Sequence, residues 1–168
     1  MSPKIKTLVD TFDWNTRFVA VGLADLSNED AGRRWRDGQG SSITYLTGHC
    51  MSSRVGLLKR FGETEDNPYG ELFGAEAEVH EPGAYPAIDQ LASEWNEVAE
   101  RLSSTLASLT EEQVMAPVKG FPIADPTARG ALMFLAWHES YHVGQIGLMR
   151  TELGYPSMQA RFKEAMRR

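Results

Sequence analysis

Four long stretches of this 168-residue chain place apolar side chains at every third or fourth position. That spacing follows the 3.6-residue turn of an α-helix, and glycine or proline separates each stretch from the next. Nowhere do apolar and polar residues alternate for long enough to predict a strand. The sequence therefore predicts an all-α fold.

The predicted helices run from Ile5 to Leu23, from Ser42 to Phe61, from Ile88 to Leu109 and from Asp125 to Met149. The third has the clearest amphipathic pattern. Long connections at 28–40, 62–86 and 116–125 join them, and the connection at 62–86 is expected to hold a short helix near Ala75–His80. Such long crossover connections predict a four-helix bundle that is not simply up-down-up-down.

Composition limits the classes of protein that this chain can be. A length of 168 residues suits a single domain spanning 1–168, which needs neither a disulfide nor a metal ion in order to fold. A net charge of −6 offers no basic surface for phosphate backbones, so no nucleic-acid partner is expected. The lone cysteine, Cys50, suits a reducing compartment, and neither a membrane span nor a targeting segment is visible. We expect a cytoplasmic protein.

Two of the four histidines, His138 and His142, are four residues apart on the last predicted helix. This spacing turns them about 40° apart on one face, about 6 Å along the axis, so that both could reach one metal ion. Because facing helices deliver side chains into a common interior, His49 on the second helix could complete a three-histidine site. Three protein ligands and an open position are typical of a catalytic metal centre. The alternative is that each is a hydrogen-bonded core histidine; His80 is expected at the surface.

The candidate site has three neighbours whose roles the sequence leaves open. Tyr141 and Gln145 each follow a histidine of the pair by three positions, so they either border a pocket or form packing and hydrogen bonds behind the ligands. Glu139 could orient an imidazole, accept a proton or form an exposed salt bridge. None of the three is an unambiguous catalytic acid or base.

Other notable side chains are expected in the core. Cys50 points about 100° around the helix from His49 and is expected to be a buried apolar residue. Trp14, Trp95 and Trp137 fall within apolar helical faces, with a pocket wall as the alternative for Trp137.

The segment from His138 to His142 also matches the zinc-peptidase pattern H-E-x-x-H. In that interpretation Glu139 activates a water molecule. The extended form of the motif requires glycine at 145 and histidine at 148, where this chain has Gln145 and Leu148. With no strand to hold a peptide substrate, the peptidase hypothesis is the least favoured.

The combination of His49 with the later run His138-Glu-Ser-Tyr-His142-Val-Gly-Gln145-Ile-Gly-Leu-Met-Arg150 resembles the DinB-like (YfiT-type) superfamily. The resemblance covers nearly the whole chain. It implies an up-up-down-down four-helix bundle that holds a divalent metal ion through His49, His138 and His142. Imidazole ligands alone do not choose among zinc, nickel, iron and copper.

Characterised members of this superfamily include transferases and isomerases that use low-molecular-weight thiols such as bacillithiol or mycothiol. The resemblance therefore implies a metal-dependent transferase that acts on a small molecule with such a thiol. Because members of the family often pair, it also implies a homodimer. The alternative is a non-catalytic bundle that binds a small ligand or a partner and keeps a vestigial metal site.

Overall fold

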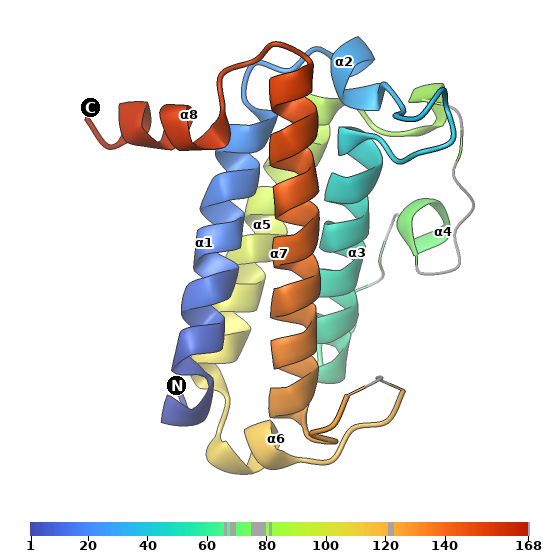
Figure 1. Cartoon of the computed structure of the whole chain (residues 1–168). Coiled ribbons are helices and arrows are strands. Elements are labelled where there is room, and N and C mark those ends of the chain that lie inside the picture. Colours follow the sequence, from blue (N-terminus) through green and yellow to red (C-terminus); the bar gives the residue numbers. More distant parts are fainter. Residues whose placement is uncertain (66, 68–69, 75–79, 81, 121–122, 168) are drawn as a thin grey trace.

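A computed structural model describes residues 1–65, 67, 70–74, 80, 82–120 and 123–167 of the chain. Four long helices lie side by side: α1 (Lys6–Leu23), α3 (Ile43–Arg60), α5 (Ile88–Ser108) and α7 (Ala128–Glu152) (Figure 1). Short helices occupy their ends and connections: η1 (Pro3–Ile5), α2 (Asn28–Gly32), α4 (Gly70–Phe73), η2 (Pro82–Ala84), α6 (Glu111–Met115) and α8 (Met158–Ala165). The described residues contain no strand, so the predicted all-α four-helix bundle is confirmed.

Local signals in the sequence set where the long helices begin and end. The side chains of Ser42 and Thr127 accept hydrogen bonds from the first turns of α3 and α7, which satisfies amide groups that have no partner within the helix. Beyond the other ends, Gly62 and Gly154 have φ angles of 101° and 86°, a conformation that glycine adopts without steric cost. The four predicted helix ranges are confirmed to within a few residues.

Contacts between the helices show their directions. Asn15 of α1 hydrogen-bonds to Ser140 of α7, and Arg150, near the end of α7, donates to the carbonyl oxygen of Gly22, near the end of α1. These two helices are therefore parallel. On α3 the order is reversed, because His49 meets His142 while Leu57 lies near Ala131.

In chain order the long helices run up, down, down and up (Figure 1), which differs from the expected up-up-down-down order. The connection 24–42 lies at one end of the bundle and α6 lies at the other end (Figure 1). As a result, α3 is antiparallel to α1, and α7 is antiparallel to α5. The end of α3 and the start of α5 lie at opposite ends of the bundle, so α3 and α5 are parallel. A long connection in a sequence can either fold at one end or cross over, so its length alone does not determine direction.

The short helices were not predicted, although one has a clear signal. Thr110 and Gln113 form a reciprocal capping box at the start of α6, and this T-x-x-Q pattern is visible in the sequence. The short helix predicted near Ala75–His80 falls largely outside the described residues. Within the same connection the structure shows α4, a little earlier, at Gly70–Phe73.

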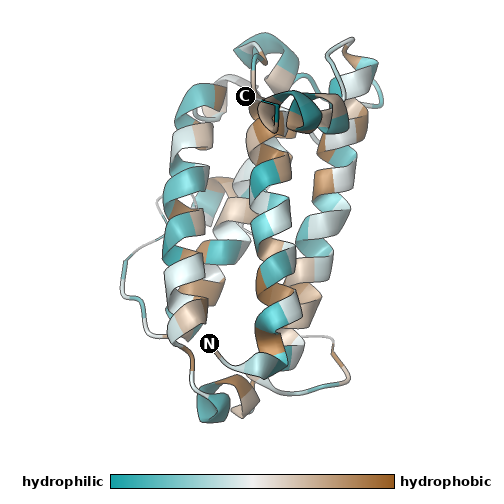
Figure 2. Cartoon of the chain, turned by 90° about the vertical axis from the view of Figure 1, so that its left-hand side faces the viewer, coloured by the Kyte–Doolittle hydropathy of each residue, from teal (hydrophilic) through white to brown (hydrophobic). Residues whose placement is uncertain are grey.

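Apolar side chains from all four long helices form one buried core, and each of these helices carries both hydrophobic and hydrophilic residues along its ribbon (Figure 2). The three tryptophans differ in their burial. Trp95 is fully buried, as predicted, and donates its indole N–H to the carbonyl oxygen of Thr16. Trp14 and Trp137 are 50% and 62% exposed, so their predicted core positions are wrong. Trp14 packs instead at the surface against Phe162 of α8, and Trp137 lies on the outer face of α7. No helix in the described part of the chain is both long and apolar enough to span a bilayer.

The different burial of the tryptophans gives a direct test of the core. We expect Trp95→Ala to lower the free energy of unfolding by about 3–5 kcal/mol, because it leaves a large cavity between the helices. Trp14→Ala, the matched surface substitution, is expected to cost less than about 1 kcal/mol. Urea unfolding followed by circular dichroism measures both; equal losses would contradict this assignment of the core.

Candidate metal centre

His49 of α3 and His138 and His142 of α7 come together between these two helices. The Nε2 atom of His138 lies 3.3 Å from that of His49 and 3.1 Å from that of His142, and each residue offers a ring nitrogen within 4.8 Å of the others. Two nitrogens bound tetrahedrally to one zinc ion at about 2.0–2.1 Å are about 3.3 Å apart. The spacing of the three imidazoles therefore fits a single metal ion.

The outer ring nitrogens of two of the histidines are held by acceptors. His49 donates from Nδ1 to the carbonyl oxygen of Phe73 at 3.2 Å, and His142 donates from Nδ1 to Oε1 of Gln145 at 2.7 Å. Because each proton sits on Nδ1, each Nε2 carries a lone pair aimed at the centre of the cluster. Histidine ligands of metal ions usually have such partners, which set the tautomer and the ring orientation.

Gly48 explains how α4 reaches His49. A Cβ atom at this position would overlap the Phe73 ring, so only glycine lets α4 pack this closely against α3. The close approach places the carbonyl group of Phe73 next to the His49 ring. The Tyr45 ring stacks on the His49 ring, with ring centres 6.0 Å apart, and meets the Phe73 ring edge-on, with ring centres 6.2 Å apart.

His138 differs from the other two histidines. Its Nδ1 is buried and has no hydrogen-bond partner among the described residues, while its Nε2 faces the lone pairs of both neighbours. Burial, together with the charges that His142 and His49 would carry, lowers the pKa of His138 from 6.5 to about 4. Burial also lowers the pKa of His49. Both imidazoles therefore stay neutral at neutral pH, the form in which imidazole binds a metal ion.

Gln145 and Tyr141 form a short hydrogen-bonded chain with His142. Gln145 accepts from His142 and donates from Nε2 to the Tyr141 hydroxyl group at 3.2 Å. Of the two alternatives open from the sequence, Gln145 follows the second, a hydrogen bond to one of the clustered histidines. Tyr141 is 56% exposed and its ring lies 5.2 Å from that of His142, so its hydroxyl group stands at the rim of the site.

Glu139 does not border the site. Its side chain is buried and accepts two hydrogen bonds from Arg54 of α3, from Nε at 2.6 Å and from Nη2 at 2.8 Å. The expected exposed salt bridge is therefore a buried one. A carboxylate held in this way faces the core and cannot activate water as the H-E-x-x-H interpretation requires.

Arg54 was missed in the sequence, although a signal exists. It lies three residues after Met51 and four before Leu58, on the apolar stripe of its helix, where a charged residue needs a buried partner.

Two other residues that the sequence analysis discussed, Cys50 and His80, do not take part in the histidine cluster. Cys50 is fully buried, which raises the pKa of its thiol well above the ordinary value, and His80 lies outside the cluster.

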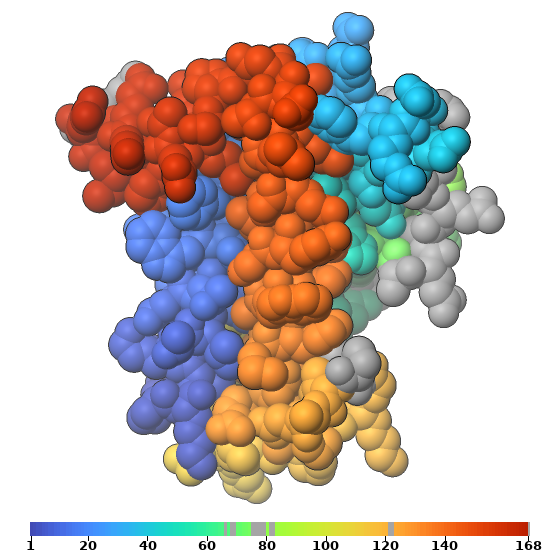
Figure 3. All heavy atoms as spheres, viewed as in Figure 1, coloured from blue at the N-terminus to red at the C-terminus, as the bar shows by residue number. Residues whose placement is uncertain are grey.

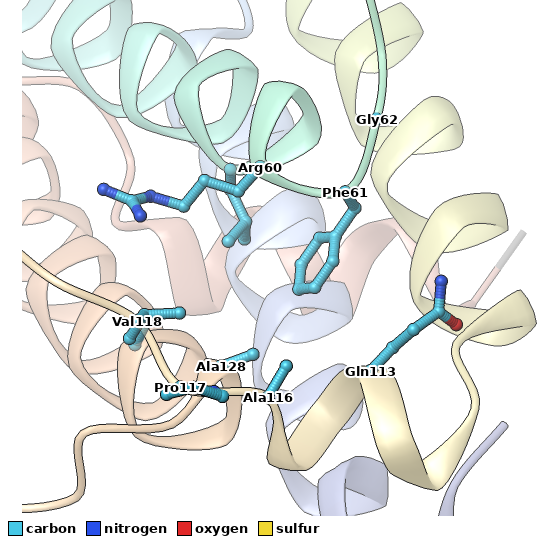
Figure 4. A pocket seen from close by; sticks show the side chains of 10 residues that line it. Arg60, Phe61, Gly62, Gln113, Ala116, Pro117, Val118 and Ala128 are labelled. Carbon is cyan, nitrogen blue, oxygen red and sulfur yellow. The ribbon is translucent and has the colours of Figure 1, made fainter.

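A cavity of about 340 Å³ opens at the other end of α3, between α3, α6 and the start of α7 (Figure 4). Phe61, Ala116 and Val118 contribute to its mainly apolar lining, and Arg60 is the one charged side chain among the described residues that line it. It has no histidine or carboxylate in this lining and is separate from the histidine cluster.

Known proteins share both the sequence pattern and the fold of this chain. The model of the DinB superfamily matches residues 13–146, a range that includes all three clustered histidines. The chain belongs to the DinB superfamily.

Three similar proteins come from Bacillus species. This DinB-superfamily chain is 22% identical over 157 residues to the uncharacterized protein YkkA of Bacillus subtilis strain 168, covering 90% of this chain and 89% of that protein. A DinB-like protein from Bacillus cereus ATCC 10987 superposes with a TM-score of 0.68 at 16% identity, covering 91% and 95% of the two chains. YfiT from Bacillus subtilis superposes with a TM-score of 0.62 at 17% identity, covering 93% and 91%. YfiT is described as a probable metal-dependent hydrolase with an unusual four-helix bundle topology.

The low pKa of His138 predicts how the metal-free protein responds to acid. Since its pKa is about 4 in the folded chain and 6.5 ordinarily, the unfolded chain takes up this proton first as the pH falls. The metal-free protein should therefore lose stability between about pH 6.5 and about pH 4, and His138→Asn should reduce that loss. Urea midpoints in EDTA at about pH 7.5 and about pH 5 measure it. An equal loss in the variant and the wild type would contradict the assignment.

Proposed function

We propose that this chain binds one divalent metal ion through the Nε2 atoms of His49, His138 and His142 and that the ion serves catalysis. The observation that carries the proposal is the convergence of three Nε2 atoms, two of them with lone pairs set by acceptors at Nδ1. The bundle has a large apolar core of its own, so the site is not required for folding. A catalytic role accounts for three ligands better than a structural role does.

Three protein ligands leave a coordination position open on the metal ion, so a small nucleophile could bind there as a reactant. A divalent ion in such a site supplies Lewis acidity, which lowers the pKa of a bound thiol or water. The chain's own residues orient the imidazoles and keep those of His49 and His138 neutral. The rings of Tyr45, Phe134 and Tyr141 lie against the three imidazoles. The described cluster includes no carboxylate that could act as a base, because Glu139 is paired with Arg54.

We propose that the nucleophile is a low-molecular-weight thiol of the bacillithiol or mycothiol kind. A free thiol has a pKa near 8.5 and bulk water one of 15.7, so a site without a carboxylate base suits the more acidic group. In the transfer, the thiol sulfur attacks an electrophilic carbon, a carbon–sulfur bond forms, and the leaving group departs with its electron pair. The thiol proton passes to solvent or to the leaving group.

Hydrolysis is the second candidate, because the structurally similar YfiT is described as a probable metal-dependent hydrolase. It would use the same three histidines with water as the nucleophile. The non-catalytic bundle requires the site to bind metal without turnover. The identity of the metal, the homodimer and the cytoplasmic location stay predictions.

Metal content tests the ligand set. Purified wild-type protein is expected to hold about one divalent ion per chain, and His49→Ala, His138→Ala and His142→Ala should each lose most of it because two imidazoles bind far more weakly than three. His80→Ala, the histidine outside the cluster, is the matched control and should keep the metal. Elemental analysis after dialysis measures all five proteins; equal and low contents throughout would refute the site.

Turnover assays separate the candidate reactions. The metal-loaded protein is expected to consume bacillithiol, mycothiol or glutathione in the presence of an alkyl or epoxide electrophile, and EDTA or His142→Ala should abolish this activity. The loss of free thiol is measured with a chromogenic disulfide. Metal-dependent cleavage of esters or amides without consumption of thiol would instead establish the hydrolase, and metal binding with neither activity would establish the non-catalytic bundle.

A further inference from the structure

The candidate metal centre depends on the register between two helices, because α3 supplies one ligand and α7 the other two. A slip of one residue moves a helix by 1.5 Å along its axis and turns its side chains by 100°. Metal–ligand distances tolerate about 0.2 Å. The pairing of α3 with α7 must therefore be set much more exactly than the packing of an ordinary apolar core requires.

Hydrophobic patterning alone does not set the rotation of α7. This helix is apolar on several sides, and its outer face along the front of the molecule (Figure 3) leaves four large apolar side chains more than half exposed: Met133, Trp137, Tyr141 and Leu148. Turning α7 would exchange some apolar side chains for others at little cost. α5 behaves differently, since its buried residues from Ile88 to Leu106 form a single stripe with polar residues opposite.

The buried face of α3 is also weakly marked. It contains Thr44, Thr47 and Gly48 as well as apolar residues, so its polar and apolar faces are not cleanly separated. The two helices that carry the ligands are thus the two whose orientation the apolar pattern specifies least. Some other interaction has to select their register.

The Arg54–Glu139 ion pair joins α3 to α7 next to the ligands. Arg54 lies five residues after His49, and Glu139 directly follows His138. Both side chains are almost fully buried, at 1% and 4% exposure, and the two parallel hydrogen bonds of a guanidinium–carboxylate fork fix orientation as well as distance. Arg54 also donates to the Phe12 carbonyl oxygen of α1 at 3.2 Å and lies 4.0 Å from the Trp95 ring centre of α5.

A buried ion pair of this kind is weak evidence for stability. Replacing such a pair with apolar residues of similar volume is often neutral or stabilising, because removing two charges from water costs about as much as their attraction returns. The ion pair instead favours one register of the two helices, because a slipped register would leave both charges buried without partners, which is strongly unfavourable.

We propose that Arg54 and Glu139 are positioning residues that hold α3 and α7 in the register at which His49 meets His138 and His142. The ion pair acts through the helices and does not touch the metal or the substrate. This inference rests on the proposed metal site, and it assigns to the pair a role in metal affinity that is separable from a role in folding.

The test compares an apolar pair with the wild type. Arg54→Met/Glu139→Leu is expected to fold with a similar or higher melting temperature, yet to bind Zn²⁺ at least about tenfold more weakly, the lower end of what losing an orienting partner costs. The visible absorption of bound Co²⁺, which reports ligand geometry, should also change. Arg150→Met is the matched control: Arg150 is equally buried on α7 but donates to Gly22 and Pro156, so its loss should lower the melting temperature and leave Zn²⁺ affinity unchanged.

The outcomes separate this inference from the proposed function. Wild-type Zn²⁺ affinity and Co²⁺ absorption in the folded apolar pair would overturn the positioning role and leave the metal site intact, whereas no Zn²⁺ binding by the wild type would overturn both. If the apolar pair does not fold, Arg54→Lys gives the answer, since lysine keeps the charge but cannot form the fork. Folded Arg54→Lys should bind Zn²⁺ more weakly than the wild type, and unchanged affinity would overturn the proposal.

Discussion

Arg54 meets all four long helices from a position with almost no solvent exposure. It belongs to α3, forms a two-pronged ion pair with Glu139 of α7, donates to a carbonyl oxygen of α1 and lies over the Trp95 ring of α5. A guanidinium group buried in this way must find its partners, because an unpaired charge in the core costs more than most packing defects. The bundle can therefore close only with its helices arranged around this side chain.

The histidine cluster lies beside that contact and is built on the same two helices. Burial keeps the imidazoles of His49 and His138 neutral, and the acceptors at Phe73 and Gln145 direct two lone pairs toward His138. Three imidazole nitrogens at this spacing stabilise one another little, since at most one proton can lie between them. A cation at the centre would satisfy all three, which links the geometry of the fold to the chemistry that we propose.

Much of the fold could be predicted from the sequence, because its signals are local. Caps such as Ser42 and Thr127 and glycines such as Gly62 and Gly154 act within one turn, so they are readable without the structure. The direction of each helix was not predictable, since apolar periodicity is the same whichever way a helix points. Trp14 and Trp137 show a related limit: a residue on an apolar stripe is buried only if another element covers it.

The candidate site also has parts that the sequence predicts and parts that it does not. The three histidines could be found from their spacing and from the resemblance to a family, and the structure brings them together. The Phe73 carbonyl group could not be found, because it is a backbone atom delivered by a tertiary contact at Gly48. Nor could the partner of Glu139, because its sequence neighbours are compatible with an exposed carboxylate as well as with a buried ion pair.

The central claim is that three imidazoles from two helices bind one ion, and X-ray absorption spectroscopy of the zinc-loaded protein tests it most directly. The account predicts three imidazole nitrogens at about 2.0–2.1 Å from the metal, with the remaining coordination supplied by a light, exchangeable ligand. A zinc ion with fewer than three imidazole ligands, or one held mainly by carboxylate oxygens, would contradict it.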